Sequence, residues 1–180
     1  VYTRALQVAP GDLDLRERLE DVQMRQLRRQ LSQAEEEYKK SGREADKQRC
    51  DQLKRRVFEN ELEIAKKRCE RYPNNLPYKY QLGVRYKLVG KYDEAIAEFQ
   101  AARNDPKYRG LCTLALGQCF QKIQEFPLAM RHYEEAIQEI ADRDADNKKL
   151  ALYLAGRLAV YLKDFDTGER YLTTLSLIHI

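Results

Sequence analysis

The side chains best suited to metal or thiol chemistry in this sequence are four cysteines and two histidines: Cys50, Cys69, Cys112, Cys119, His132 and His179. No two cysteines form a Cys-x-x-Cys pair, and neither histidine stands at a ligand spacing, so the pattern predicts no metal site. Cys112 and Cys119 are seven residues apart, which places them on one face of a helix as small buried apolar side chains. The spacing indicates no disulfide framework, so this cysteine usage is compatible with a reducing compartment and favours a cytoplasmic location.

Catalytic and nucleic-acid chemistry find no support in the remaining residues. There is no glycine-rich phosphate loop and no nucleophile in a recognisable elbow, and the carboxylates occur in charged stretches typical of solvated helix faces. The net charge of +4 is spread along the chain, so the short basic runs at 54–56 and 66–68 predict no nucleic-acid surface. No apolar run reaches the roughly 18 residues of a membrane span. We therefore expect no enzymatic activity, no cofactor and no membrane insertion within this chain.

An internal repeat organises residues 76–141. Matched positions 34 residues apart are Gly83 and Gly117, Tyr86 and Phe120, Tyr92 and Phe126, Ala95 and Ala129, Phe99 and Tyr133, and Ala102 and Ala136. A fixed period of this length with matched small and aromatic residues is typical of stacked helical repeats. Small residues let two helices approach closely, and the aromatic side chains fill the space around the crossing.

The pattern resembles the tetratricopeptide repeat (TPR), a helix-turn-helix unit. The residues that carry the resemblance are Leu82, Gly83, Tyr86, Gly90-Lys91-Tyr92, Ala95, Phe99, Ala102 and Pro106. The second repeat departs from the family pattern because Gln124 replaces the turn glycine and the terminal proline is missing. The resemblance implies an all-α fold in which antiparallel helix pairs stack as an α-solenoid.

Residues 13–73 span 61 positions where an ordinary repeat takes about 32. Apolar residues spaced three and four apart continue through this stretch, with charged residues and glutamine between them, as in paired coiled-coil helices. We therefore expect one repeat to be extended into a long helical hairpin that turns at Ser41-Gly42 and projects into water.

The expected divisions of the chain are 1–12, 13–75, 76–109, 110–148 and 149–180. The first is the tail of a truncated repeat, which predicts a further repeat before Val1, and a signal peptide or anchor upstream stays open. A polar loop at 142–147 lengthens the period before a third repeat that carries Gly156 and Gly168. The apolar segment 175–180 does not resemble the polar end of a solenoid, so we expect a non-native C-terminus there.

The resemblance also implies a concave groove lined by the first helix of each repeat. Its expected partner-binding residues are Tyr80, Gln81, Val84, Lys87, Leu88, Leu114, Gln118, Gln121, Lys122, Tyr153, Arg157, Val160 and Tyr161. Packing alone is the alternative role for some of them, notably Val84 and Leu114. The lysines, the arginine and the tyrosines predict a protein or peptide partner with negative charge and apolar anchors.

Chaperone-binding members of the family hold a C-terminal carboxylate with a clamp of Lys, Asn and Arg side chains. The matching positions here are Tyr80, Val84, Ala115, Leu150 and Leu154, and none has the required donor. The sequence therefore predicts a protein-interaction scaffold that does not bind chaperone tails. The alternative is a regulatory or docking segment of a larger multidomain enzyme, and these residues alone leave both open.

Overall fold

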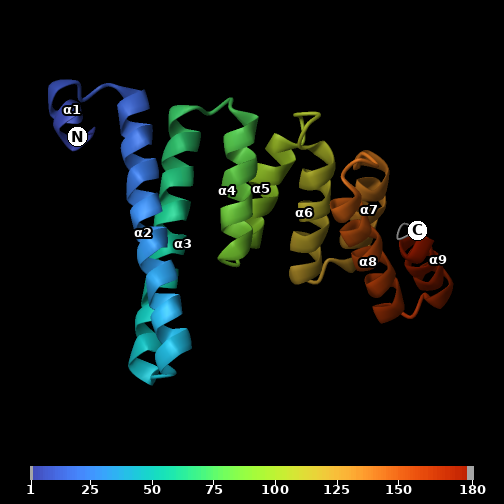
Figure 1. Cartoon of the computed structure of the whole chain (residues 1–180). Coiled ribbons are helices and arrows are strands. Elements are labelled where there is room, and N and C mark those ends of the chain that lie inside the picture. The colour runs from blue at the N-terminus through green and yellow to red at the C-terminus, as the bar shows by residue number, and fades with distance from the viewer. Residues whose placement is uncertain (1, 178–180) are drawn as a thin grey trace. The chain divides into compact units, whose positions relative to one another are not determined.

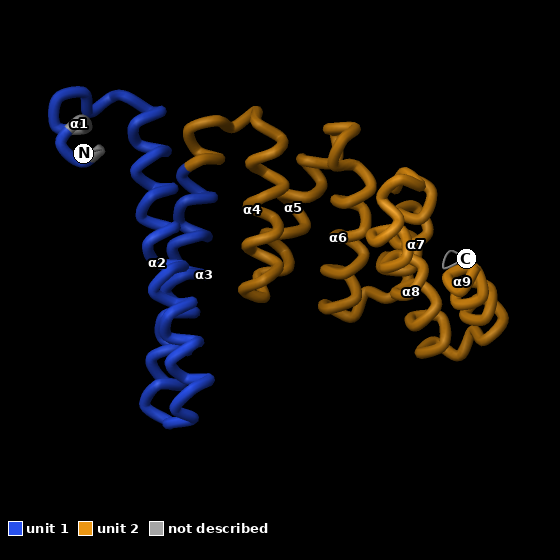
Figure 2. Tube along the Cα trace, viewed as in Figure 1, with its two compact units in different colours: residues 1–67 blue, residues 68–180 orange. Residues whose placement is uncertain are grey.

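The structure, a computed structural model, describes residues 2–177, which form nine α-helices (Figure 1). The chain divides into two compact units, residues 1–67 and 68–180 (Figure 2). The helices are α1 (Tyr2–Val8), α2 (Leu13–Ser41), α3 (Glu44–Arg71), α4 (Leu76–Leu88), α5 (Tyr92–Ala102), α6 (Arg109–Lys122), α7 (Phe126–Glu139), α8 (Ala145–Tyr161) and α9 (Phe165–Leu177). The expectation of a non-native C-terminus falls in part on residues 178–180, which lie outside the described residues.

Unit 1 contains α1, α2 and most of α3. Helix α2 begins at an N-cap, where the Asp12 carboxylate accepts a hydrogen bond from the Leu15 amide at 3.0 Å. It ends at Gly42, whose φ of 62° is the left-handed conformation that glycine adopts without a Cβ penalty. The chain reverses there into α3, which confirms the predicted helical hairpin and its turn.

A narrow apolar seam and flanking ion pairs join α2 to α3. Ala34, Cys50, Leu53 and Val57 are buried, whereas most other residues of the two helices are exposed. Across the seam Glu37 pairs with Arg49 at 2.7 Å. Such exposed pairs stabilise a fold by about 0–1 kcal/mol each, so burial along the seam is the main stabilising contribution.

Unit 2 contains three helix-turn-helix pairs, α4 with α5, α6 with α7, and α8 with α9 (Figure 1). Each pair turns through one residue in the left-handed conformation: Gly90 at φ 80°, Gln124 at φ 66° and Lys163 at φ 65°. At each turn the following amide donates to the carbonyl five residues back, from Lys91 to Tyr86, Glu125 to Phe120 and Asp164 to Ala159, at 2.9–3.0 Å. The three turns therefore repeat one helix-ending geometry.

The close approach inside each pair depends on a glycine of the first helix. A Cβ on Gly83 would lie 2.8 Å from the Phe99 ring, one on Gly117 2.6 Å from the Tyr133 ring, and one on Gly156 2.9 Å from the Leu172 side chain. Contacts this short are not tolerated without a shift of the neighbouring group. The predicted repeat register, with 34 residues between the first two glycines and 39 to the third, is confirmed by these contacts.

The core of unit 2 contains two clusters of buried residues, and the partly buried Phe120 packs against both. One cluster of buried residues lies between α5 and α6: Ala95, Phe99, Ala102, Cys112, Ala115, Leu116 and Cys119. The next joins α6, α7 and α8: Leu114, Ala129, Tyr133, Ala136, Ile140, Ala151, Ala155 and Leu158. Because each helix pair buries its apolar face against the next, the stack has the nearest-neighbour organisation of a solenoid.

One expectation is wrong in part. Within the polar segment 142–147 only residues 142–144 lie in the connection, because α8 begins at Ala145 and continues to Tyr161. The first fully buried residue of α8 is Ala151, so the inserted residues add a mostly half-buried stretch of helix before the repeat core begins. None of the helices within residues 2–177 combines the length and apolar character needed to cross a bilayer.

Candidate functional site

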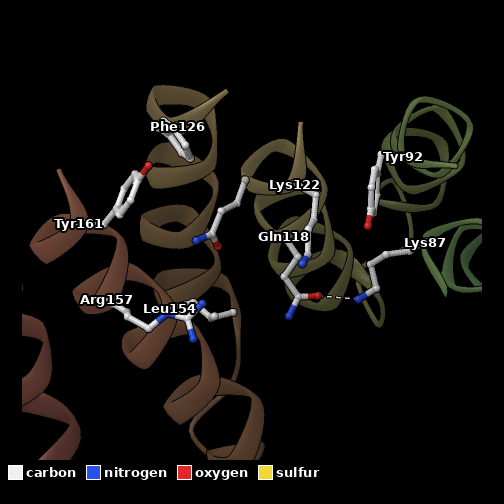
Figure 3. A pocket seen from close by; sticks show the side chains of 9 residues that line it. Lys87, Tyr92, Gln118, Lys122, Phe126, Leu154, Arg157 and Tyr161 are labelled. Atoms are coloured by element: carbon white, nitrogen blue, oxygen red, sulfur yellow. Dashed lines mark hydrogen bonds between the residues drawn. The ribbon is translucent and has the colours of Figure 1, made fainter. Parts of the chain in front are cut away.

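Unit 2 contains a cleft of about 470 Å³, which we call the α4–α8 cleft (Figure 3). It is lined by Lys87, Tyr92, Gln118, Gln121, Lys122, Phe126, Leu154, Arg157 and Tyr161. These residues come from five consecutive helices. The stacking of helix pairs therefore brings together side chains up to 74 positions apart in the sequence, from Lys87 to Tyr161.

The cationic end of the cleft consists of Lys87, Gln118 and Lys122, with the Tyr92 hydroxyl directed toward it (Figure 3). The Lys87 ammonium donates a hydrogen bond to Gln118 Oε1. Burial lowers the pKa of Lys87 because partial removal from water disfavours the charged form. Among residues 2–177, no carboxylate lies within salt-bridge distance of Lys87 or Lys122.

The aromatic end consists of Phe126, Leu154 and Tyr161. Phe126 is the first residue of α7 and Tyr161 the last of α8, and their ring centroids are 5.3 Å apart with a tilt of 59°. Tyr161 is 68% exposed, so its ring offers free surface beside the more buried Phe126. Arg157 adds a third cation near Leu154 (Figure 3), with no carboxylate in salt-bridge range within the described chain.

Gln121 connects the cleft to the core. Its Oε1 accepts a hydrogen bond at 2.6 Å from the hydroxyl of Tyr133, a fully buried side chain that packs against Gly117. Burial raises the pKa of the Tyr133 phenol, so this side chain stays a neutral donor. The hydrogen bond from the buried Tyr133 therefore fixes the orientation of the Gln121 amide.

The structure brings six of the predicted groove residues into the cleft: Lys87, Gln118, Gln121, Lys122, Arg157 and Tyr161. Of the others, Leu114 is buried in the α6–α8 core, and Val84 packs against the α5–α6 cluster. Tyr80 lies with its ring 4.8 Å from that of Tyr108. Outside the cleft lining, the exposed predicted residues are Gln81, Leu88, Tyr153 and Val160.

Sequence reasoning missed three cleft residues. Tyr92 and Phe126 are matched repeat positions that it assigned to packing, although each is only partly buried. Both are the first residue of the second helix of a pair, and this position could have indicated a binding role. The first residue of a helix lies at the edge of the stack, so one side of its side chain can stay uncovered. Leu154 was considered only as a clamp position without a donor.

The cysteines lie outside the cleft. Cys50, Cys112 and Cys119 are buried as predicted, and Cys69 is partly buried. Burial raises the pKa of the Cys112 thiol to about 12 and that of Cys119 to about 11. Both thiols are therefore protonated at neutral pH and behave as apolar core groups.

A polar network joins neighbouring repeats away from the cleft. The Arg103 guanidinium, at the end of α5, donates to Glu135 at 3.0 Å and to Glu139 at 2.9 Å, both on α7. His132 is 6% exposed, stacks on Phe120 at 5.2 Å and has Nδ1 3.4 Å from the Glu135 carboxylate. Burial, partly opposed by Glu135, lowers the pKa of His132 below its ordinary value.

We expect His132 to make the stability of unit 2 depend on pH. Because the folded form binds this proton less tightly than the unfolded chain does, stability falls as the pH drops through the ordinary histidine pKa of about 6.5. His132→Phe keeps the stacked ring and removes the titration. Urea unfolding at about pH 7.5 and about pH 5.5 should therefore show a smaller acid loss in the variant than in the parent protein. Equal losses in both proteins would contradict a buried neutral His132.

Comparisons with known proteins bear on the fold. No family model matches the sequence, and no curated protein matches it either. The solved structure described as the crystal structure of MamA is similar to this chain, with a TM-score of 0.59 and 21% sequence identity. The similarity covers 72% of this chain and 72% of the MamA chain. This likeness to MamA, a TPR-type repeat protein, shows that the chain has a TPR-like, all-helical repeat fold.

Proposed function

We propose that this chain is a member of the TPR family and a non-enzymatic interaction scaffold, and that the α4–α8 cleft binds a protein partner through an exposed segment. The segment carries negative charge and at least one large apolar side chain. The repeats that form the cleft consist of α4 with α5, α6 with α7, and α8 with α9. A scaffold role is consistent with a stacked helical fold whose apolar faces are used for packing between repeats.

The observation that carries this proposal is the charge of the lining. The cleft contains three cations, Lys87, Lys122 and Arg157, and none of its nine lining residues is acidic. No salt bridge within the described chain neutralises them. An anionic segment would provide the missing counter-charge, and complementary charge mainly increases the association rate and the specificity of binding.

The aromatic end supports an apolar anchor on the same segment. Aromatic residues dominate binding energies because they bury a large area with little loss of side-chain entropy. Phe126 and Tyr161 form such a surface beside Leu154. Their arrangement favours a large aliphatic or aromatic side chain of the partner.

The partner is not the C-terminal tail of a chaperone. Of the positions that would hold its carboxylate, Ala115 is buried and Tyr80 packs beside Tyr108. Leu150 and Leu154 offer no hydrogen-bond donor on their side chains. The cations of the cleft, Lys87, Lys122 and Arg157, do not occupy the clamp positions. This difference supports an internal acidic segment of the partner as the ligand.

Selection from a random peptide library displayed on phage tests the proposal without a known partner. We expect enrichment of peptides that combine Asp or Glu with a large apolar residue. Tyr161→Ala should weaken the selected peptides by about 2 kcal/mol, as for a binding hot spot. Lys122→Glu should mainly slow association and reduce its salt dependence.

Phe165→Ala is the matched control, because Phe165 is 64% exposed on α9 and does not line the cleft. It should leave the affinity of the selected peptides unchanged. Peptides that bind Tyr161→Ala and Lys122→Glu as well as the parent protein would show that the recognition surface lies elsewhere, for example on the α2–α3 hairpin.

A further inference from the structure

Each of the two glutamines of the cleft already accepts a hydrogen bond from the protein at its carbonyl oxygen. Gln118 Oε1 accepts from the Lys87 ammonium, and Gln121 Oε1 accepts from the Tyr133 hydroxyl. A glutamine side chain has one carbonyl acceptor and two N–H donors. With each oxygen engaged by a donor of the protein, these residues present mainly their amide N–H groups to a ligand.

The other polar groups around them are also donors. The Lys87 and Lys122 ammonium groups and the Arg157 guanidinium have no acceptor function, and each lies in the same cleft. No lining residue is a carboxylate. Most side-chain polar groups of the cleft are therefore hydrogen-bond donors. The remaining acceptors are the hydroxyls of Tyr92 and Tyr161 and the second lone pairs of the two amide oxygens.

From this donor surface we infer that the cationic end is a subsite for a phosphoryl group, carried by a phosphorylated side chain of the partner segment. The inference rests on the proposed function and specifies the anion it takes. A phosphate monoester has about two negative charges at neutral pH and three acceptor oxygens. It can neutralise both lysines and accept from the Gln118 amide at once.

A carboxylate fits this end less completely. It has one charge and two oxygens, so one of the two ammonium groups would remain without a counter-charge. The partly buried Lys87 makes this difference larger, because an uncompensated cation removed from water is unfavourable. The ring of a phosphorylated tyrosine, or a neighbouring apolar residue, would contact the aromatic end formed by Phe126, Leu154 and Tyr161.

The test compares two small probes on the intact chain, phenyl phosphate and phenylacetate, which pair a ring with two charges or with one. Titrations followed by ¹H–¹⁵N NMR report directly on the side-chain amides of Gln118 and Gln121. We expect phenyl phosphate to bind about tenfold more tightly, which corresponds to one additional charge-assisted hydrogen bond. Shifts should concentrate on the two amides and on α6.

Two variants separate the subsite from general charge attraction. Gln118→Glu keeps the partner of Lys87 but removes the amide donors and adds a negative charge, so phenyl phosphate binding should fall about tenfold or more. Lys122→Gln removes one ammonium from an exposed position and should reduce the preference for phosphate over carboxylate. Gln100→Glu, an exposed position on α5 outside the cleft, makes the same charge change and should have no effect.

Equal affinity for the two probes would overturn the phosphoryl subsite, and so would phenyl phosphate binding that survives Gln118→Glu. Neither result would affect the proposed function if acidic peptides still required Tyr161. Conversely, peptides that ignore the cleft variants would overturn the proposed function, whatever the probes show.

Discussion

Tyr133→Ala is expected to lower the free energy of unfolding of unit 2 by about 3–5 kcal/mol, the usual loss when a large buried aromatic side chain is removed. Tyr133 is fully buried, fills the space over Gly117 and belongs to the core that joins α6, α7 and α8. Ala129 and Ala136, which belong to the same cluster, are too small to fill the cavity that the substitution would leave. Urea unfolding followed by far-UV circular dichroism measures the change.

Tyr133→Phe separates packing from the polar contact. It keeps the ring and removes only the hydroxyl that donates to Gln121. We expect a loss of about 0.5–1.5 kcal/mol, typical of one hydrogen bond. If the two variants unfold at the same urea concentration, the ring does not have the packing role that its burial indicates.

Gly83→Leu is expected to destabilise the α4–α5 pair by about 1–3 kcal/mol through overpacking. The first added carbon would lie 2.8 Å from the ring of Phe99, which is fully buried and has no free space to move into. Leucine favours a helix by up to about 1 kcal/mol relative to glycine, so the measured loss includes that opposing gain. The midpoint of chemical unfolding reports the net change.

Gly11→Leu is the matched control for this substitution. A Cβ on Gly11 meets no atom within 4 Å, and the residue is exposed. We expect a change within about 0.5 kcal/mol, as for an ordinary surface position. An unchanged midpoint for Gly83→Leu as well would mean that the helix crossing is not where the repeat register places it.

The repeat register was readable from the sequence because close helix crossings require particular residues. Gly83 and Gly117 stand where the first helix crosses Phe99 and Tyr133, and a Cβ at either position would clash with the ring. The spacing of residue types in the sequence therefore reflects the geometry of the helix crossing. The turn residues show where this signal weakens. Gln124 and Lys163 adopt the same left-handed conformation as Gly90, at a local conformational cost that the surrounding helices offset.

The cleft was only partly predictable. Position within a repeat identified Lys87, Gln118 and Arg157, because those side chains lie on the first helix of each pair. It did not identify Phe126, since an aromatic residue at a matched position satisfies a packing role and a binding role equally well. Only the spacing between neighbouring helix pairs decides how much of such a ring is left uncovered.

The inserted residues before α8 show a different limit. Their polar composition predicted a loop, yet helix α8 begins at Ala145, and four of its first six residues are half-buried. A polar stretch is compatible with either state, because a helical turn outside the fully buried core needs no apolar residue. Continuation from the packed part of α8 decides between them, and this is a tertiary effect.

The uneven burial of the helices in unit 2 has a consequence for motion. Eight residues of α6 are buried between its neighbours, whereas α9 buries only Gly168 and packs mainly against α8. In a stack with nearest-neighbour coupling, α9 is therefore expected to open locally at a lower free energy than α6. Tyr161 is the last residue of α8 and precedes the turn into α9, whereas Gln118 lies within α6. The aromatic end of the cleft is therefore the more compliant side and the cationic end the more rigid one. An arriving ligand would meet a preformed electrostatic contact first, and the softer wall could then adjust to the shape of the apolar side chain.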